Sequence, residues 1–208
     1  MSDETVPLSI DPADDDSFAG VLRSVMGKFL QNVDDMLPCE VIAVQADRQR
    51  VTVRPIVMMG TTDGQKVSRA QVASVPVLNI GAGGFLLSFP VKQGDLGWLK
   101  ASDRDISLVM QGLKEEWPNT TRMHSFQDGL FIPHHMRQWT LSGEDTDAMV
   151  LQSTDGTTRV AIGAGLIKLT ATAVEIESST LTHNGVNVGD DHTHSGVDTG
   201  PGNTGPPT

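Results

Sequence analysis

A seven-residue repeat near the C-terminus, "VAIGAGL IKLTATA VEIESST LTHNGVN" (residues 160–187), decides the fold of this 208-residue chain. Apolar side chains recur at the first and third positions of the units. These positions hold Val160/Ile162, Ile167/Leu169, Val174/Ile176 and Leu181/His183. A spacing of two is typical of a strand, whereas a coiled coil requires apolar residues at positions one and four. Each unit is therefore predicted to be a short strand followed by a turn rich in Gly, Ser, Thr and Ala.

A repeat this thin cannot bury its own apolar face. Two apolar side chains per unit, at about 25 cal/mol per Å² of buried surface, do not offset the entropy lost when seven residues are ordered. Neighbouring chains must close the core. Three copies around one axis would do so and would leave no open strand edge. Residues 149–198 are therefore predicted to form a trimeric β-helix, a stiff and narrow rod.

Two histidines, His192 and His194, follow the repeat close to the end of the chain. Side chains of a strand alternate between two faces, and continuing this alternation from the inward Val188 places both histidines on the inward face. A three-fold axis then brings six imidazoles to one level, which suits one octahedral ion. Iron is favoured, with nickel or zinc as possible substitutes. We expect one Fe per trimer, held by six histidines with no position open for a substrate, so that the site is structural.

Three other residues near this pair allow more than one interpretation. His183 occupies an inward position of the repeat, where it is either a core histidine hydrogen-bonded to its neighbours or a ligand of a second axial ion. Asp190 and Asp191 either hydrogen-bond the two histidines or belong to a turn, and the turn is favoured for Asp191. Residues 199–208 are expected to form a tail.

From Cys39 onward apolar residues occur at every second position, which is the period of a strand. Residues 38–111 are predicted to form a barrel. Turns are expected at Ala46-Asp47-Arg48, "GAGG" and "VKQGD". Five or six short strands over so few residues favour a small closed barrel of the OB type. The strand candidates are "CEVIAV", "RVTVRPIV", "VASVPVLNI", "GGFLLSFP", "DLGWLKAS" and "ISLVMQG".

Residues 112–148 show no regular period and are expected to be an irregular linker. His124, His134 and His135 lie in this segment. Adjacent histidines in extended backbone point apart, so His134 and His135 do not readily chelate one ion. We expect these three side chains to pack on the surface or in an interface.

Residues 1–37 are predicted to be an acidic arm followed by an amphipathic helix. Asp16 or Ser17 can cap the helix, and Pro38 ends its pattern. The apolar stripe packs either on its own domain or on a neighbouring subunit. It comprises Phe18, Val21, Leu22, Val25, Phe29, Val33 and Leu37.

The composition excludes several classes of protein. The net charge is −11, with acidic residues concentrated at both ends and a nearly neutral centre, so no basic surface for nucleic acid is indicated. Cys39 is the only cysteine, which rules out a disulfide within the chain. No apolar run approaches the roughly 20 residues of a membrane span, and no signal peptide opens the sequence. We expect a protein made in a host cytoplasm.

The stretch "LTHNGVNVGDDHTHSGV" (residues 181–197) resembles the C-terminal tip of the central spike proteins of contractile-tailed bacteriophages. "VIAVQADRQRVTVRPIV" (41–57) and "RMHSFQDGLFIP" (122–133) are similar to the OB-type domain of that family and the linker after it. The resemblance covers about residues 38–198. The departures are the Asp190-Asp191 pair and the 14 residues that follow His194.

The resemblance implies a homotrimer at the tip of the tail baseplate of a virion. The barrels would form a collar held by the tail hub or tube and the baseplate proteins. The rod would be driven through the bacterial outer envelope by contraction of the sheath and would contact the outer membrane only mechanically. His192 and His194 match the histidines that bind iron at the apex in that family. No nucleic acid and no catalytic residues are expected.

Two alternatives come from other functional classes. The first is a metal-dependent enzyme of the cupin type, which also uses a His-x-His motif but needs further Glu and His ligands. Only 14 residues follow His194, and none is Glu, His or Cys. The second is an envelope carbohydrate-binding or lytic tail component. The sequence shows no paired carboxylates or Cys/His arrangement in a recognisable context, and few aromatic residues for binding sugar.

Overall fold

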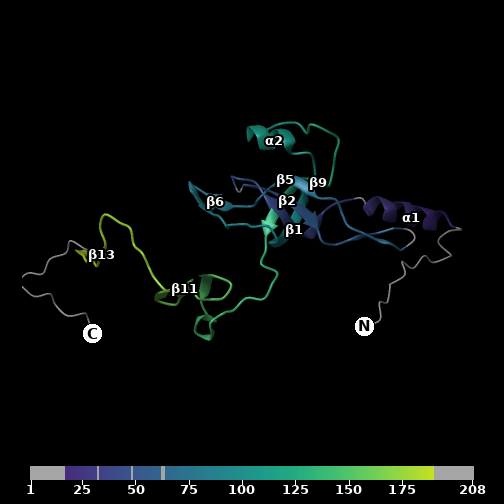
Figure 1. Ribbon diagram of the computed structural model, residues 1–208. Coiled ribbons are helices and arrows are strands. Elements are labelled where there is room, and N and C mark those ends of the chain that lie inside the picture. Colours follow the sequence, from purple (N-terminus) through teal and green to yellow (C-terminus); the bar gives the residue numbers. More distant parts are fainter. Residues whose placement is uncertain (1–16, 32, 48, 62–63, 190–208) are drawn as a thin grey trace, which may run out of the picture. The chain divides into compact units, whose positions relative to one another are not determined.

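The computed structural model describes residues 17–31, 33–47, 49–61 and 64–189 (Figure 1). The chain divides into two compact units, Met1–Gln138 and Trp139–Thr208. Strands are more numerous than helices in the described residues, so the prediction of a mainly β protein is confirmed. None of the described helices has the length and apolarity needed to cross a membrane.

The first unit is built on a strongly bent sheet of five antiparallel-paired strands. In spatial order the strands are β5 (Val72–Pro76), β2 (Arg50–Pro55), β1 (Met36–Val44), β8 (Leu96–Ser102) and β9 (Ser125–Pro133). The two outer strands approach each other, because Val77 forms a parallel bridge with Phe131 and the Leu78 amide donates to the Phe131 carbonyl at 2.8 Å. The sheet is therefore a nearly closed barrel, as the sequence predicts.

The barrel interior is filled by small and branched side chains from alternating strand positions. On β8, for example, Leu99 and Ala101 are buried while their neighbours are more exposed, which is the period of two expected for a one-sided strand. The buried apolar cluster consists of Cys39, Val41, Val51, Val53, Val75, Val77, Val91, Leu99, Ala101, Phe126 and Phe131.

The fifth strand, β9, extends the barrel beyond the segment expected from sequence. Residues 112–148 were expected to be irregular, but Ser125–Pro133 pair with β8 and bury Phe126 and Phe131. The strand candidate "ISLVMQG" is also wrong, because Ser107–Gly112 form the short helix α2. The preceding Asp105 accepts a hydrogen bond from the Ser107 amide at 2.9 Å, which favours a turn at this point.

The N-terminal helix α1 (Phe18–Leu30) is capped as expected, since the Ser17 hydroxyl accepts a hydrogen bond from the Gly20 amide at 3.0 Å. It ends before the predicted boundary at Pro38. The Asp34 amide donates to the His124 carbonyl at 3.0 Å, and the Phe126 amide donates to the Asp34 carboxylate at 3.3 Å. These tertiary bonds commit the chain to strand β1 from Met36 onward.

Two small hairpins extend the first unit. One joins β3 (Met59–Gly60) to β4 (Lys66–Val67), and the other joins β6 (Ile80–Ala82) to β7 (Phe85–Leu87). The "GAGG" turn of the second hairpin is confirmed, because Gly83 and Gly84 both have positive φ, at 61° and 86°.

The second unit contains a meander and a small hairpin. After the 3₁₀ turn η2 (Gly143–Asp145), the strands β10 (Met149–Gln152), β11 (Arg159–Gly163) and β12 (Leu166–Thr170) pair antiparallel in chain order. The strands β13 (Thr182–His183) and β14 (Val186–Asn187) form the hairpin. The first two heptads thus supply strands of five residues rather than three, and the trimeric β-helix rod stays a prediction.

Candidate assembly surface

One face of the meander is an apolar surface. Antiparallel register sets Met149 opposite Ile162, Leu151 opposite Val160, Val160 opposite Leu169, and Ile162 opposite Ile167. Directly paired residues lie on the same side of a sheet. The six residues that share this side are Met149, Leu151, Val160, Ile162, Ile167 and Leu169. We call this set the meander face.

The meander face is largely open in the single chain. Met149 is 69% exposed, Ile167 68% and Leu169 57%. By contrast Ala161, on the other side of β11, is 3% exposed. A contiguous apolar surface of this kind is typical of a contact with another chain. The predicted inward positions of the first two heptads therefore do share one face, and most of that face is exposed within the described part of the chain.

Charged groups cover the opposite side of the meander. The Arg159 guanidinium donates from Nε to Asp145 at 2.5 Å, and the Asp145 side chain is almost fully buried. The Lys168 ammonium donates to Glu144 at 2.6 Å, and this hydrogen bond lowers the pKa of the Glu144 carboxyl. The ion pairs anchor η2 to β11 and β12. The meander therefore has one satisfied polar side and one apolar side that is largely exposed.

The small hairpin repeats this arrangement with shorter strands. Asn184 and Gly185 have positive φ, at 49° and 81°, which is the two-residue turn that matches strand twist. His183 pairs with Val186, so the histidine shares its side with an apolar residue. Among the described residues the His183 ring has no hydrogen-bond partner, and both interpretations of this histidine stay open.

The predicted metal ligands, His192 and His194, lie outside the described residues, as do Asp190 and Asp191. Within the part of the chain that the structure describes, no group of three or more His, Cys, Asp or Glu side chains could hold a metal ion. The iron site therefore stays a prediction from sequence.

The three histidines of the first unit lie at its surface. His134 stacks on Trp98 with ring centroids 6.1 Å apart, and the indole Nε1 donates to its Nδ1 at 2.6 Å. The His135 Nε2 lies 3.4 Å from the Gln138 carbonyl, and the His124 Nδ1 lies 3.8 Å from an Asp103 carboxylate oxygen. These contacts agree with the expected surface packing.

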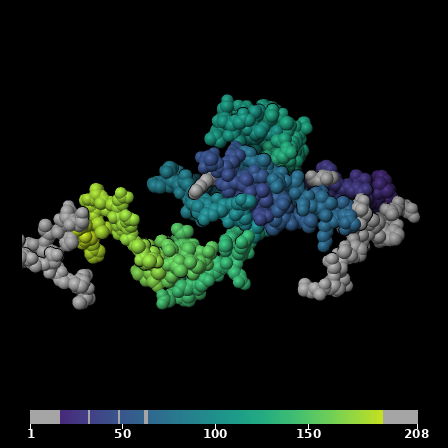
Figure 2. Space-filling model, in the orientation of Figure 1, coloured from purple at the N-terminus to yellow at the C-terminus, as the bar shows by residue number. Residues whose placement is uncertain are grey.

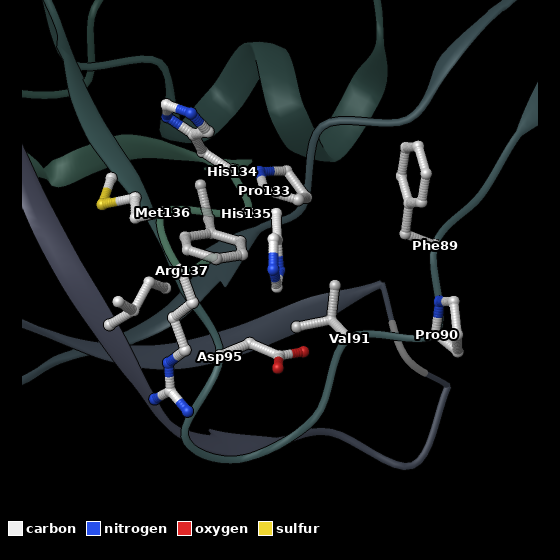
Figure 3. A pocket seen from close by; sticks show the side chains of 11 residues that line it. Phe89, Pro90, Val91, Asp95, Pro133, His134, His135, Met136 and Arg137 are labelled. Carbon is white, nitrogen blue, oxygen red and sulfur yellow. The ribbon is translucent and has the colours of Figure 1, made fainter. Parts of the chain in front are cut away.

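A pocket of about 470 Å³ opens beside the end of β9 (Figure 3). Val91 and Phe131 are its buried apolar residues, while Asp95, His135 and Arg137 are exposed. Figure 3 shows Phe89 and Met136 on opposite sides, with His135 between them. The remaining lining residues are Pro90, Leu96, Pro133 and His134. Sequence reasoning did not find this pocket, because its walls come from separate strands and loops.

Sequence reasoning also did not find a buried cluster of charged side chains in the first unit. Arg122 donates to both carboxylate oxygens of Asp128, from Nε at 2.6 Å and from Nη2 at 2.9 Å, and lies 3.3 Å from Asp105. Asp105 accepts further hydrogen bonds from the Ser107 amide and the Thr120 hydroxyl. Hydrogen bonds from Ser107 and Thr120 hold the pKa of the Asp105 carboxyl well below its ordinary value. The cluster closes the base of the loop that carries α2.

Comparison with known proteins gives one family match, and it lies in the first unit. Residues 37–134 match the family model of the phage protein Gp138 N-terminal domain. The match runs from the start of β1 to the end of β9, so it covers the whole barrel. A search of the curated proteins found no match. These findings support a phage structural protein of the baseplate type and a component of the virion.

Proposed function

We propose that the chain is a subunit of a homotrimeric central spike at the tip of a contractile phage tail. The barrels form a collar that the tail hub or tube holds with the baseplate proteins. The second unit forms a rod that sheath contraction drives through the bacterial outer envelope. The work comes from the sheath, so the protein needs stiffness and has no catalytic turnover.

The observation that carries this proposal is the meander face. Its six apolar side chains lie on one side of a sheet whose other side is closed by ion pairs. The simplest partner for such a surface is the same surface on identical chains. Closed rotational symmetry then buries the apolar face of every copy, and no second protein is needed. Three copies turn three thin sheets into one core, which is the mechanical design that a piercing rod requires.

The apex of the rod is the second part of the proposal. His192 and His194 of three copies would bind one iron and join the chains where apolar contacts end. The metal would act as a structural link.

Removing the tip tests the piercing function. Particles that carry a deletion of residues 183–208 keep the barrel and the meander, so we expect them to assemble and contract. They should infect poorly, and the loss should grow on hosts with a thicker surface layer. If these particles delivered their genome as well as the parental particles do, that result would contradict the proposal.

A turnover assay separates piercing from the lytic alternative. The purified full chain should release no fragments from peptidoglycan or surface polysaccharide. A measurable rate of degradation by the chain alone, lost together with the tip, would instead establish an envelope-degrading enzyme.

A further inference from the structure

The β6–β7 hairpin is an uncharged apolar projection of the first unit. Residues 70–91 contain no charged side chain, although the chain as a whole carries a net charge of −11. Phe85, next to the turn, is 84% exposed, and its neighbour Leu86 is 69% exposed. Within the first unit the hairpin extends away from the barrel (Figures 1 and 2). An exposed hairpin of this composition invites edge pairing and aggregation unless another surface covers it.

The pocket beside β9 has the complementary shape and chemistry. Its floor is apolar and buried, formed by Val91 and Phe131, and its volume of about 470 Å³ admits an aromatic side chain. Its rim is polar, with Asp95, His135 and Arg137 exposed. An apolar floor inside a polar rim is the arrangement of an energetic hot spot in a protein interface.

We propose that the β6–β7 hairpin of one copy inserts Phe85 into the β9 pocket of the next copy. The hairpin and the pocket are different surfaces of the same unit, so the contact is heterologous, and in the proposed homotrimer it closes into a ring of three. An aromatic side chain buries about 150–250 Å² in such a pocket. This contact would hold the collar together independently of the rod.

Two observations favour a second copy as the occupant of the pocket. Phe85 is 84% exposed in its own chain, so the hairpin does not fill the pocket beside it. A ring also removes the exposed hairpin and the open pocket from every subunit at once, with no other protein required. The inference rests on the proposed homotrimer and specifies how its collar is held.

Cross-linking of the full chain tests the contact. Ala82→Cys combined with Met136→Cys places one thiol on the hairpin and one on the pocket wall, and it keeps Phe85 because Ala82 is the residue that pairs with it across the hairpin. The native Cys39 does not compete, because it is buried and desolvation raises the pKa of its thiol to about 12. A short bis-maleimide should convert the double variant into a covalent trimer on a denaturing gel. Each single variant should stay monomeric on that gel.

A second pair supplies the matched control. Gln127 lines a different pocket of the barrel, so Ala82→Cys with Gln127→Cys should give no covalent trimer. Phe85→Glu should lower the thermal midpoint of the trimer by several degrees, whereas Leu113→Glu should not. Leu113 is a fair comparison because it is 81% exposed in the single chain.

The outcomes separate this inference from the proposed function. A trimer in light scattering that yields no covalent product overturns the hairpin contact and leaves the spike proposal standing. A monomer in light scattering overturns both. A ladder longer than three chains overturns the closed ring, and cross-linking of Ala82→Cys to a hub protein within particles overturns the second copy as occupant.

Discussion

At the scale of single residues, two glycines set the packing of the barrel. A Cβ on Gly97 would overlap the Phe131 ring, and a Cβ on Gly129 would lie 2.8 Å from the Leu99 side chain. Real Cβ atoms do not approach so closely, so these strand positions are glycine because large core side chains occupy the space.

Gly97→Ala should therefore destabilise the barrel by about 1–3 kcal/mol through overpacking. Denaturant unfolding, followed by tryptophan fluorescence, measures the change. Gly60→Ala is the matched control, since a Cβ at Gly60 has no neighbour within 4 Å. Equal stability of the two variants would contradict the packing seen around Phe131.

We expect the buried Asp105 to make the first unit sensitive to acid. Its folded pKa lies below the ordinary value of 3.8, so the unfolded chain takes up the proton first as the pH falls. The stability that Asp105 contributes is present above about pH 4 and declines below it. Asp105→Asn should lower stability at neutral pH and flatten the loss between about pH 4 and pH 2.

Unfolding midpoints at a series of pH values measure this slope. Asp103→Asn serves as the control because the Asp103 side chain is 84% exposed. A pH slope unchanged in Asp105→Asn would mean that other carboxyl groups govern the acid response.

At the scale of elements, the meander shows how one sheet acquires two different sides. Arg159 and Lys168 point to the side that η2 covers, while Ile162 and Ile167 point to the open side. The same alternation gives ion pairs on one side and, on the other, the apolar face proposed for assembly.

Ile167→Lys should break assembly without unfolding the meander, because the new charge would lie in the covered interface. Light scattering should show a shift from trimer toward monomer at micromolar concentration. Asp147→Asn is the matched control, since it changes the net charge by the same amount at an exposed position outside the sheet. A variant Ile167→Lys that stays fully trimeric would place the interface elsewhere.

At the scale of the whole molecule, the proposed trimer would have two independent sources of stability, the collar and the rod, and an iron-bound apex would add a third. His192→Ala combined with His194→Ala should abolish bound iron and leave the trimer intact. Elemental analysis of protein purified without an affinity tag should fall from one iron per three chains to none.

His124→Asn is the control for this experiment, because His124 lies in the first unit outside the β9 pocket and should leave the iron in place. Asparagine is chosen because it tolerates the positive φ of 45° at this position. One metal per chain, rather than one per three chains, would favour the cupin-like alternative.

The sequence by itself determined the features that depend on local chemistry. The period of two after Cys39 indicated the barrel strands, the Ser17 hydroxyl capped its own helix, and the glycines of "GAGG" made a hairpin turn. The spacing of Val160, Ile162, Ile167 and Leu169 predicted that these side chains share a face. Each of these signals lies within a few residues, where side-chain direction and φ preference are set by the neighbours in the chain.

Only the tertiary structure decided the features that join distant segments. Ser125–Pro133 became a barrel strand because β8 was available to pair with it, and Met36 entered β1 because Asp34 bonds to the backbone of residues 124 and 126. The Arg122 cluster and the β9 pocket likewise combine residues far apart in sequence. Which strand a segment pairs with, and which of its side chains are buried, depend on the whole barrel. No local sequence pattern therefore specifies the partner of a segment.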